Sequence, residues 1–196
     1  APFAAQPALP GGYIRAAEDD DTQAAAARML REKTGIDSPY LEQLATFSGR
    51  DRDPRGWSLS VAYYALVPYA LIEHAGHPAV TLLPVDRADD LPFDHAQIVA
   101  AAVQRVRNKS SYSSLPVYLC GDSFPLPQLQ AVYEAILGEP INKVSFRRKI
   151  EALDMVEPLA GAMETGKAHR PAQLYRLREC YARNLSLTDR ALNAKG

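Results

Sequence analysis

Residues 12–36 constrain the fold of this 196-residue chain more than any other stretch. A glycine pair at 11–12, an acidic run at 18–21, an alanine-rich segment and a closing Thr-Gly-Ile follow one another without interruption. Thr22 or an adjacent aspartate can cap a helix at its start, and glycine favours the left-handed backbone that ends one. The order therefore predicts a loop, a helix and a second loop. The acidic run also has a simple explanation, because negative charge is favourable at a helix N-terminus.

Positions 29, 32 and 33 of this helix share one face because they are spaced i, i+3 and i+4. Three carboxylates on that face could hold Mg²⁺, which prefers oxygen ligands. The face carries Met29, Glu32 and Lys33 instead. Unit charges about 4 Å apart at an effective dielectric of about 20 interact by roughly 4 kcal/mol, so an ammonium beside a divalent ion costs about twice that. We therefore expect no metal site here, with Glu32 as the remaining candidate ligand.

These residues resemble the Nudix box, the loop–helix–loop with which Nudix hydrolases hold a divalent metal against a diphosphate. The family pattern falls on residues 28–33 and Gly35, and two of its three helix carboxylates are absent. A further glutamate of the family fits either Glu18 or Asp20. The resemblance implies a Nudix fold without efficient hydrolysis, hence no catalytic residue and no cofactor. An ordinary capped helix is the alternative for the segment taken alone.

Length and composition favour two units. An apolar content of 47% supports a packed core. Residues 1–109 carry 11 basic and 14 acidic side chains, a net charge of −3, and residues 110–196 carry 11 and 9, a net charge of +2. This asymmetry permits an anionic partner for the second half. Cys120 and Cys180 lie in apolar contexts and suit buried thiols in a reducing compartment. With no visible signal peptide, we expect a cytoplasmic protein.

The first unit should be an α+β domain. Period-two alternation predicts strands at 40–47 and 57–67, a further strand is expected at 80–85, and a helix at 94–108. His95, near the start of that helix, is expected to be a capping or surface residue rather than a ligand. We also expect strands from residues that precede Ala1, because a Nudix sheet needs them.

The loop between the first two predicted strands carries three arginines. A polar turn with balanced charge is one interpretation, and a phosphate clamp by Arg52 and Arg55 is the other, because arginines donate bidentately to phosphate oxygens. The loop and the strand after it resemble those of ADP-ribose-handling Nudix proteins. The nucleotide site predicted in this way consists of Gly11, Gly12, Arg28, Glu32, Arg52 and Arg55.

Serines at 110–114 indicate a boundary, which predicts a Nudix-like domain at 1–109, a linker at 110–113, a DNA-binding domain at 114–183 and a tail at 184–196. Within the second domain we expect a strand at 115–120, a helix ending at Gly138, a helix from 146 to 156 capped by Ser145, and a hairpin at 162–177. Helix, tight turn, basic helix and hairpin are typical of a winged helix-turn-helix.

Four of the eight residues at 142–149 are basic. Arg147 and Arg148 are the candidates for guanine contacts, because they lie on the outward face of the predicted recognition helix. The full predicted DNA-binding set is Lys143, Ser145, Arg147, Arg148, Lys149, Lys167, His169 and Arg170. The alternative is a small helical domain with a solvated basic face.

Taken together, the degenerate box, the Asp-Arg-Asp-Pro-Arg-Gly loop, Ser-Phe-Arg-Arg-Lys-Ile and Arg-Pro-Ala-Gln-Leu-Tyr-Arg resemble the Nudix-related transcriptional regulators of NAD metabolism, the NrtR-like proteins. The resemblance implies an α/β/α Nudix-type mixed sheet, incomplete at its N-terminus, followed by a winged helix. It also implies a homodimeric repressor that binds a palindromic double-stranded DNA operator and senses ADP-ribose or a related nucleotide. The alternatives are a Mg²⁺-dependent ADP-ribose pyrophosphatase and a nucleotide-binding interaction protein without a DNA partner.

Overall fold

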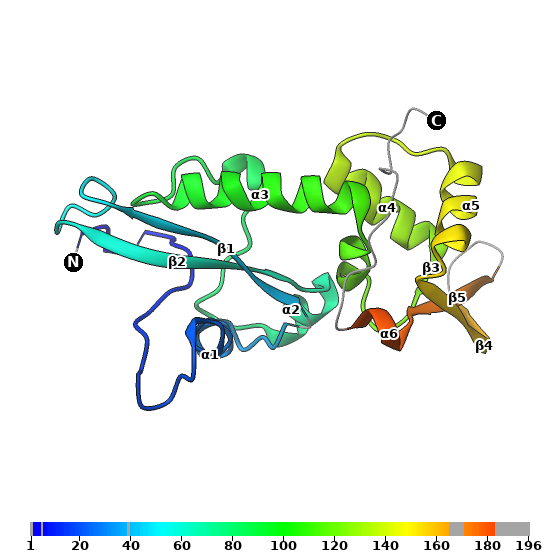
Figure 1. Ribbon diagram of the computed structural model, residues 1–196, viewed down its shortest axis with the longest axis horizontal. Coiled ribbons are helices and arrows are strands. Elements are labelled where there is room, and N and C mark those ends of the chain that lie inside the picture. The colour runs from blue at the N-terminus through cyan, green and yellow to red at the C-terminus, as the bar shows by residue number, and fades with distance from the viewer. Residues whose placement is uncertain (1, 5, 39, 165–170, 183–196) are drawn as a thin grey trace. The chain divides into compact units, whose positions relative to one another are not determined.

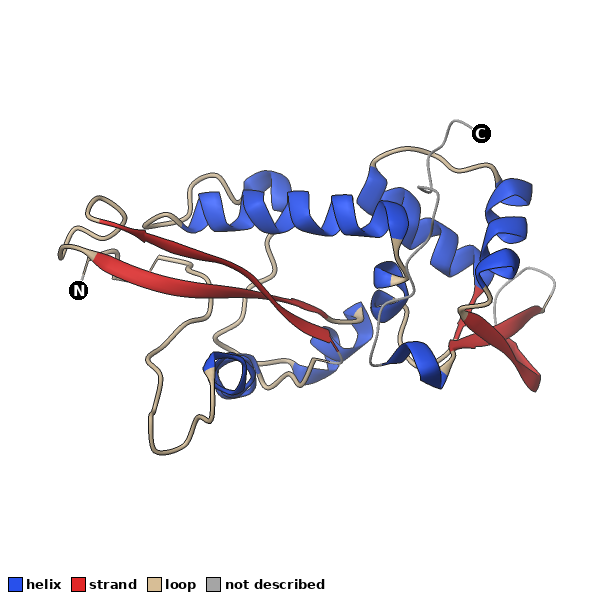
Figure 2. Ribbon diagram, viewed as in Figure 1, coloured by secondary structure: helices blue, strands red, loops and turns tan. Residues whose placement is uncertain are grey.

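The computed structural model describes residues 2–4, 6–38, 40–164 and 171–182 (Figures 1 and 2). The chain forms two compact units, Ala1–Arg105 and Val106–Gly196, and the boundary falls inside helix α3 (His95–Tyr112). Residues 110–112, expected to be a linker, are instead the end of α3. The Ser111 hydroxyl donates to the carbonyl oxygen of Asn108 at 2.7 Å, and the Ser113 hydroxyl, just after the helix, donates to that of Lys109 at 2.6 Å.

Helix α1 (Thr22–Thr34) has the ends that its sequence predicts. The carboxylate of Asp21 accepts from the backbone N–H of Ala24 at 2.7 Å, which caps the start. Gly35 has a φ of 72°, and its N–H donates to the carbonyl of Arg31 at 2.9 Å, which closes the helix. Both ends depend on contacts within four residues, and this is why the sequence predicts them.

The sheet of the first unit is an antiparallel ribbon of β1 (Tyr40–Gly49) and β2 (Ser58–Leu66), both close to the predicted strands. The prediction of a strand at 80–85 is wrong. These residues are irregular and lead into a 3₁₀ turn, η1 (Val85–Arg87). Among the described residues the ribbon has two strands, so the expected mixed sheet is not seen. Residues with a high strand propensity form a strand only where they can pair with another strand and bury one face. Leu82 and Leu83 are 53% and 42% exposed, so this segment has no buried face.

The remaining elements of the first unit flank this ribbon. A short helix, α2 (Tyr69–Ala75), follows β2. Helix α1 and the first part of α3 lie on either side of the ribbon in Figure 1. The side chains buried in this unit include Ala25, Leu44, Tyr64, Leu66 and Ile98.

The second unit is a winged helix, as predicted. Its elements are η2 (Leu115–Leu119), β3 (Phe124–Pro125), α4 (Leu126–Leu137), α5 (Lys143–Leu153), β4 (Val156–Glu164), β5 (Ala172–Leu177) and α6 (Glu179–Ala182). The three strands pair in the order β3-β5-β4, and both pairs are antiparallel. The strand expected at 115–120 is wrong: a proline in the first turn and short-range carbonyl contacts favour the 3₁₀ helix η2.

Helices α4 and α5 pack through an aromatic pair and are joined by a hydrogen-bonded turn. The rings of Tyr133 and Phe146 meet edge to face at 5.6 Å, and both residues are buried. In the turn, the carboxylate of Glu134 accepts from Gln130 at 3.0 Å and from the backbone N–H of Ile141 at 2.8 Å. The hydrogen bond from Gln130 lowers the pKa of Glu134. These contacts determine the direction in which α5 leaves the turn.

Helix α5 begins earlier than the sequence suggested. Asn142, not Ser145, is its N-cap: the Asn142 side-chain oxygen accepts from the backbone N–H groups of Val144 and Ser145, each at 3.0 Å. Lys143 and Val144 are therefore the first residues of the helix rather than part of the turn. Asparagine and serine both cap helices well, so the choice between them rests on the geometry of the preceding turn.

The two cysteines differ in environment. Cys120 is buried, and its burial raises the pKa of the thiol to about 12, whereas Cys180 is exposed, contrary to expectation. Within the ranges described, no helix has the length and apolar character needed to cross a membrane.

Candidate functional site

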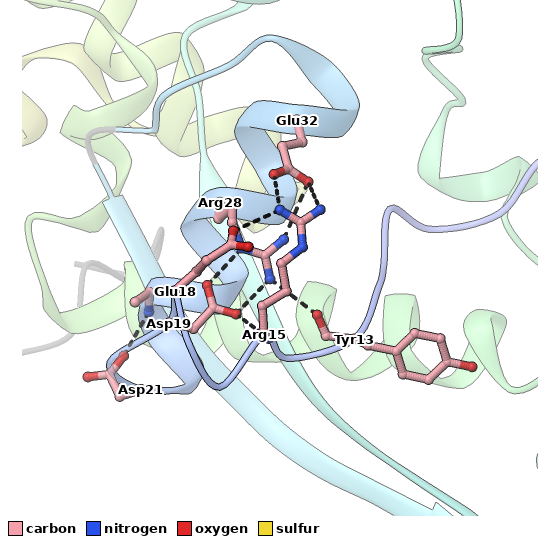
Figure 3. A network of polar contacts seen from close by, with 8 residues as sticks. Tyr13, Arg15, Glu18, Asp19, Asp21, Arg28 and Glu32 are labelled. Atoms are coloured by element: carbon pink, nitrogen blue, oxygen red, sulfur yellow. Dashed lines mark hydrogen bonds and ion pairs between the residues drawn. The ribbon is translucent and has the colours of Figure 1, made fainter.

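The loop before α1 is held to the helix by a partly buried ion pair between Asp19 and Arg28 (Figure 3). Arg28 donates from Nε at 2.7 Å and from Nη2 at 2.6 Å, and the two side chains are only 14% and 2% exposed. The hydrogen bonds from Arg28 lower the pKa of Asp19 to about 2. The sequence suggested Glu18 or Asp20 as the carboxylate of this loop. The structure assigns the contact with Arg28 to Asp19.

Glu32 is held by two arginines, as Figure 3 shows. Arg15 donates to both of its oxygens, at 2.8 and 3.2 Å, and Arg28 donates at 3.3 Å. Arg15 also contacts Glu18 at 3.0 Å, and its backbone N–H donates to Asp19 at 2.7 Å. Sequence reasoning missed Arg15. Its position three residues before the acidic run was the available signal.

Gly12 lies directly against Met29. A Cβ atom at Gly12 would be 2.2 Å from the Met29 sulfur, so any other residue would displace that side chain. A Cβ at Gly11 would meet nothing closer than 4.0 Å, so that glycine has no comparable constraint. The thioether therefore fills the space between the glycine turn and the helix.

The residues of this site do not fit a divalent metal ion. Met29 offers no oxygen, Lys33 is an exposed cation, and Glu32 is engaged by two guanidinium groups. Among the described residues, no group of three or more His, Cys, Asp or Glu side chains could hold a metal ion. The predicted contribution of Glu32 to a metal site is therefore unsupported by its surroundings.

Arg52 and Arg55 have different environments. Arg52 donates to both oxygens of Asp94 at 2.8 and 3.0 Å, and this pair is largely buried. It also donates to Ser58 and Ser60, so a phosphate contact would require exchange of these partners. Arg55 is 61% exposed and paired with Asp53 at 2.6 Å. It is therefore the more accessible of the two predicted phosphate ligands.

An aromatic residue that the sequence did not indicate lies beside Arg55. Phe93 has a φ of 60°, which is strained for a residue other than glycine, and its ring centroid is 6.0 Å from the Arg55 guanidinium carbon. His95 is next to it, with the ring centroids 5.4 Å apart. His95 is half-buried and accepts from the backbone N–H of Leu9 at 3.1 Å, so it is neither a helix cap nor a surface residue.

The second candidate site is the outer face of α5. Lys143, Arg147 and Arg148 are exposed, and no carboxylate in the described ranges forms an ion pair with them. Lys149 and Ser145 are half-buried. Lys167, His169 and Arg170 lie outside the described residues. Three of the predicted DNA contacts are thus brought together on one surface.

Val144 completes this surface and was missed by sequence reasoning. Its side chain is 76% exposed, although valine is among the residue types most often buried. A cap at Ser145, as the sequence predicted, would have placed Val144 in the turn before the helix. With Asn142 as the cap, Val144 is in the first turn of the helix.

The fold and these two sites define a class of protein, namely a Nudix-like unit joined to a winged helix with a basic recognition helix. The family model described as the NrtR DNA-binding winged helix domain matches residues 116–177. A protein of Acinetobacter baylyi named "ADPR responsive transcriptional repressor NtrR" is 43% identical over 173 residues, which cover 86% of this chain and 68% of that protein. The chain belongs to this family of NrtR-type transcriptional regulators.

Two further relatives match the chain over different lengths. The crystal structure of Shewanella oneidensis NrtR complexed with a 27mer DNA superposes with a TM-score of 0.85 at 37% identity, covering 95% of this chain and 85% of that one. An ADP-ribose pyrophosphatase of Methanocaldococcus jannaschii is 31% identical over 100 residues, or 50% of this chain and 57% of the enzyme. The first covers both units, and the second covers half the chain.

Proposed function

We propose that this chain is a cytoplasmic transcriptional repressor of NAD-metabolism genes, which binds a palindromic operator as a homodimer and releases it when the first unit binds ADP-ribose or a related nucleotide. The observation that carries the proposal is the recognition helix α5. It lies on a winged helix and presents exposed basic residues, in a chain that shares its family with a repressor. Cations on a recognition helix contact phosphates and base edges in the major groove.

The roles of the basic residues follow from their chemistry. Arginine donates bidentately to the O6 and N7 atoms of guanine, so Arg147 and Arg148 are the proposed base contacts. Lys143 is a flexible point charge near the N-terminus of α5 and suits a phosphate. Ser145 and Lys149, together with Lys167, His169 and Arg170 beyond the described part, are proposed as supporting contacts to the DNA backbone.

The nucleotide site is proposed in the first unit. Gly12, Arg28 and Glu32 are adjacent, and the carbonyl of Tyr13 accepts from Arg28 at 3.2 Å. Arg55 is included in the proposed site because its guanidinium is 61% exposed and could donate to a phosphate.

The proposed coupling between the sites is a shift between two arrangements of the dimer. ADP-ribose would favour an arrangement whose winged helices do not match the spacing of the operator half-sites. Support for a dimer comes from large apolar side chains exposed in the first unit, among them Trp57 at 65%, Leu59 at 54% and Tyr69 at 62%. A second copy of the chain would cover them.

Hydrolysis is the competing function, because a pyrophosphatase matches half of the chain. We propose that this chain is not an efficient enzyme, since two of the three box carboxylates are replaced and the third is bound by arginines. Steady turnover of ADP-ribose with Mg²⁺ above about 1 s⁻¹, the low end of ordinary enzymes, would contradict this.

The proposed function is tested by selecting duplexes from random DNA with the full chain and measuring mobility shifts with competitor DNA present. Specific binding should persist, and ADP-ribose should release the duplex. Arg148→Ala should reduce binding free energy for the selected sequence by about 1–3 kcal/mol with little effect on random DNA. Lys143→Ala should weaken both equally and reduce the salt dependence. If no sequence is enriched, the repressor proposal is wrong.

A further inference from the structure

Five charged side chains of the loop and α1 form one connected network of ion pairs, in which arginines supply the positive charge. Three carboxylates, those of Glu18, Asp19 and Glu32, face two guanidinium groups, those of Arg15 and Arg28 (Figure 3). Three negative and two positive charges leave a net charge of −1. A divalent ion held by three carboxylates would leave the same charge. The two arginines therefore neutralise these carboxylates to the same extent as a divalent ion would.

Arg15 and Arg28 differ in what they can still bind. The Arg28 side chain is 14% exposed, and four of its five N–H groups donate to Asp19, Glu32 and the carbonyl of Tyr13. Arg15 is 46% exposed, and three of its five N–H groups donate to Glu18 and Glu32. In the described chain, no acceptor takes the Nε proton or the second Nη2 proton of Arg15. Two donors on an exposed cation thus remain for a ligand.

We propose that the nucleotide site is independent of metal, because the Arg15 guanidinium, held between Glu18 and Glu32, takes the place of the divalent cation and donates directly to the diphosphate of the ligand. This inference rests on the proposed function, since it concerns the same nucleotide site. Guanidinium groups bind phosphate oxygens through two parallel hydrogen bonds. Two carboxylates hold Arg15 in place before the ligand arrives, which reduces the loss of side-chain entropy on binding.

The proposal is tested by calorimetric titration of the full chain with ADP-ribose, in excess EDTA and in excess MgCl₂. The two dissociation constants should agree within about two-fold. Arg15→Ala should weaken binding about 10- to 100-fold, the usual value of hydrogen bonds to a charged group. Arg15→Lys should be intermediate, because it keeps the charge but not the bidentate geometry.

Arg31→Ala is the matched control. Arg31 lies on the same helix, is 62% exposed and pairs with Asp37 at 2.7 Å, away from the carboxylates of the box. Its removal should leave ADP-ribose affinity unchanged. Circular dichroism and thermal unfolding of each variant verify that the fold is retained.

A second measurement uses Mn²⁺ alone, followed by electron paramagnetic resonance, and needs no nucleotide. The wild-type chain should bind the ion weakly, and Arg15→Ala should bind it at least about ten-fold more tightly, because Glu18 loses its arginine partner and Glu32 keeps only the contact with Arg28. Unchanged Mn²⁺ affinity in this variant would overturn the inference.

The outcomes separate the two proposals. ADP-ribose binding that requires Mg²⁺, or an Arg15→Ala affinity equal to that of Arg31→Ala, would overturn the inference and leave the proposed function intact. Absence of ADP-ribose binding in both buffers would overturn both proposals.

Discussion

The role of each residue in the box depends on its neighbours more than on its type. Met29 could be an ordinary core residue, but the glycine at position 12 approaches its sulfur so closely that the two positions form one unit. Glu32 could be a metal ligand, but two arginines occupy its oxygens. A carboxylate that accepts several charged hydrogen bonds is satisfied and has little capacity for a cation.

Val144 should contact a thymine methyl group, because an exposed apolar side chain at the start of a recognition helix lies where base edges are read. Loss of one buried methyl group costs about 0.8 kcal/mol, or about four-fold in affinity. Replacement of the contacted thymine by deoxyuridine removes one methyl group and should therefore weaken operator binding about four-fold. Val144→Ala removes two carbons and should weaken it by roughly 4- to 15-fold. Fluorescence anisotropy on singly substituted operators measures both.

The two changes should not be additive, since each removes the same contact. Val85→Ala is the control, because it shortens a valine that is 57% exposed in the first unit. Equal sensitivity of wild type and Val144→Ala to deoxyuridine at every thymine would exclude the contact.

At the scale of elements, the start of α5 decides which residues lie on the proposed DNA-binding surface. The cap at Asn142 moves the first turn of the helix toward the preceding loop and places Lys143 and Val144 on the helix surface. The turn itself is held by Glu134 and Gln130 of α4. The recognition surface is thus a consequence of how two helices are joined.

Asn142→Ala should reduce the free energy of unfolding by about 1 kcal/mol, because two backbone N–H groups lose their acceptor. Ser145→Ala should change it by no more than about 0.5 kcal/mol, as for a substitution away from a cap. Urea unfolding of the full chain, followed by circular dichroism, compares the two. If Ser145→Ala reduced the free energy of unfolding more than Asn142→Ala did, Ser145 would be the cap.

At the scale of the whole molecule, the two sites must be coupled in both directions. If ADP-ribose reduces operator affinity by some factor, operator DNA must reduce ADP-ribose affinity by the same factor. Typical coupling free energies of about 1–3 kcal/mol correspond to roughly 5- to 150-fold.

Two titrations measure this coupling: operator binding with and without saturating ADP-ribose, and ADP-ribose binding with and without saturating operator. The ratios of dissociation constants should agree, and random DNA at the same salt concentration should give a ratio near one. If ADP-ribose released DNA but operator DNA did not change ADP-ribose affinity, the proposed two-state equilibrium would be wrong.

The sequence alone determined the features whose causes are local. The ends of α1 follow from Asp21 and Gly35, each within four residues of its partner. The alternation of β1 and β2, the winged helix and the family were also predictable, since periodicity and motif order are properties of the chain itself.

The tertiary structure decided everything that depends on distant partners. Arg52 forms a largely buried ion pair with Asp94, 42 residues away. This contact engages a guanidinium that the sequence predicted to bind phosphate. Residues 80–85 have the composition of a strand, but they pair with no strand among the described residues. Arg15 reaches Glu32 across 17 residues of loop and helix. Side-chain contacts between separate segments leave no periodic pattern in the sequence, so only the folded chain reveals which charges meet.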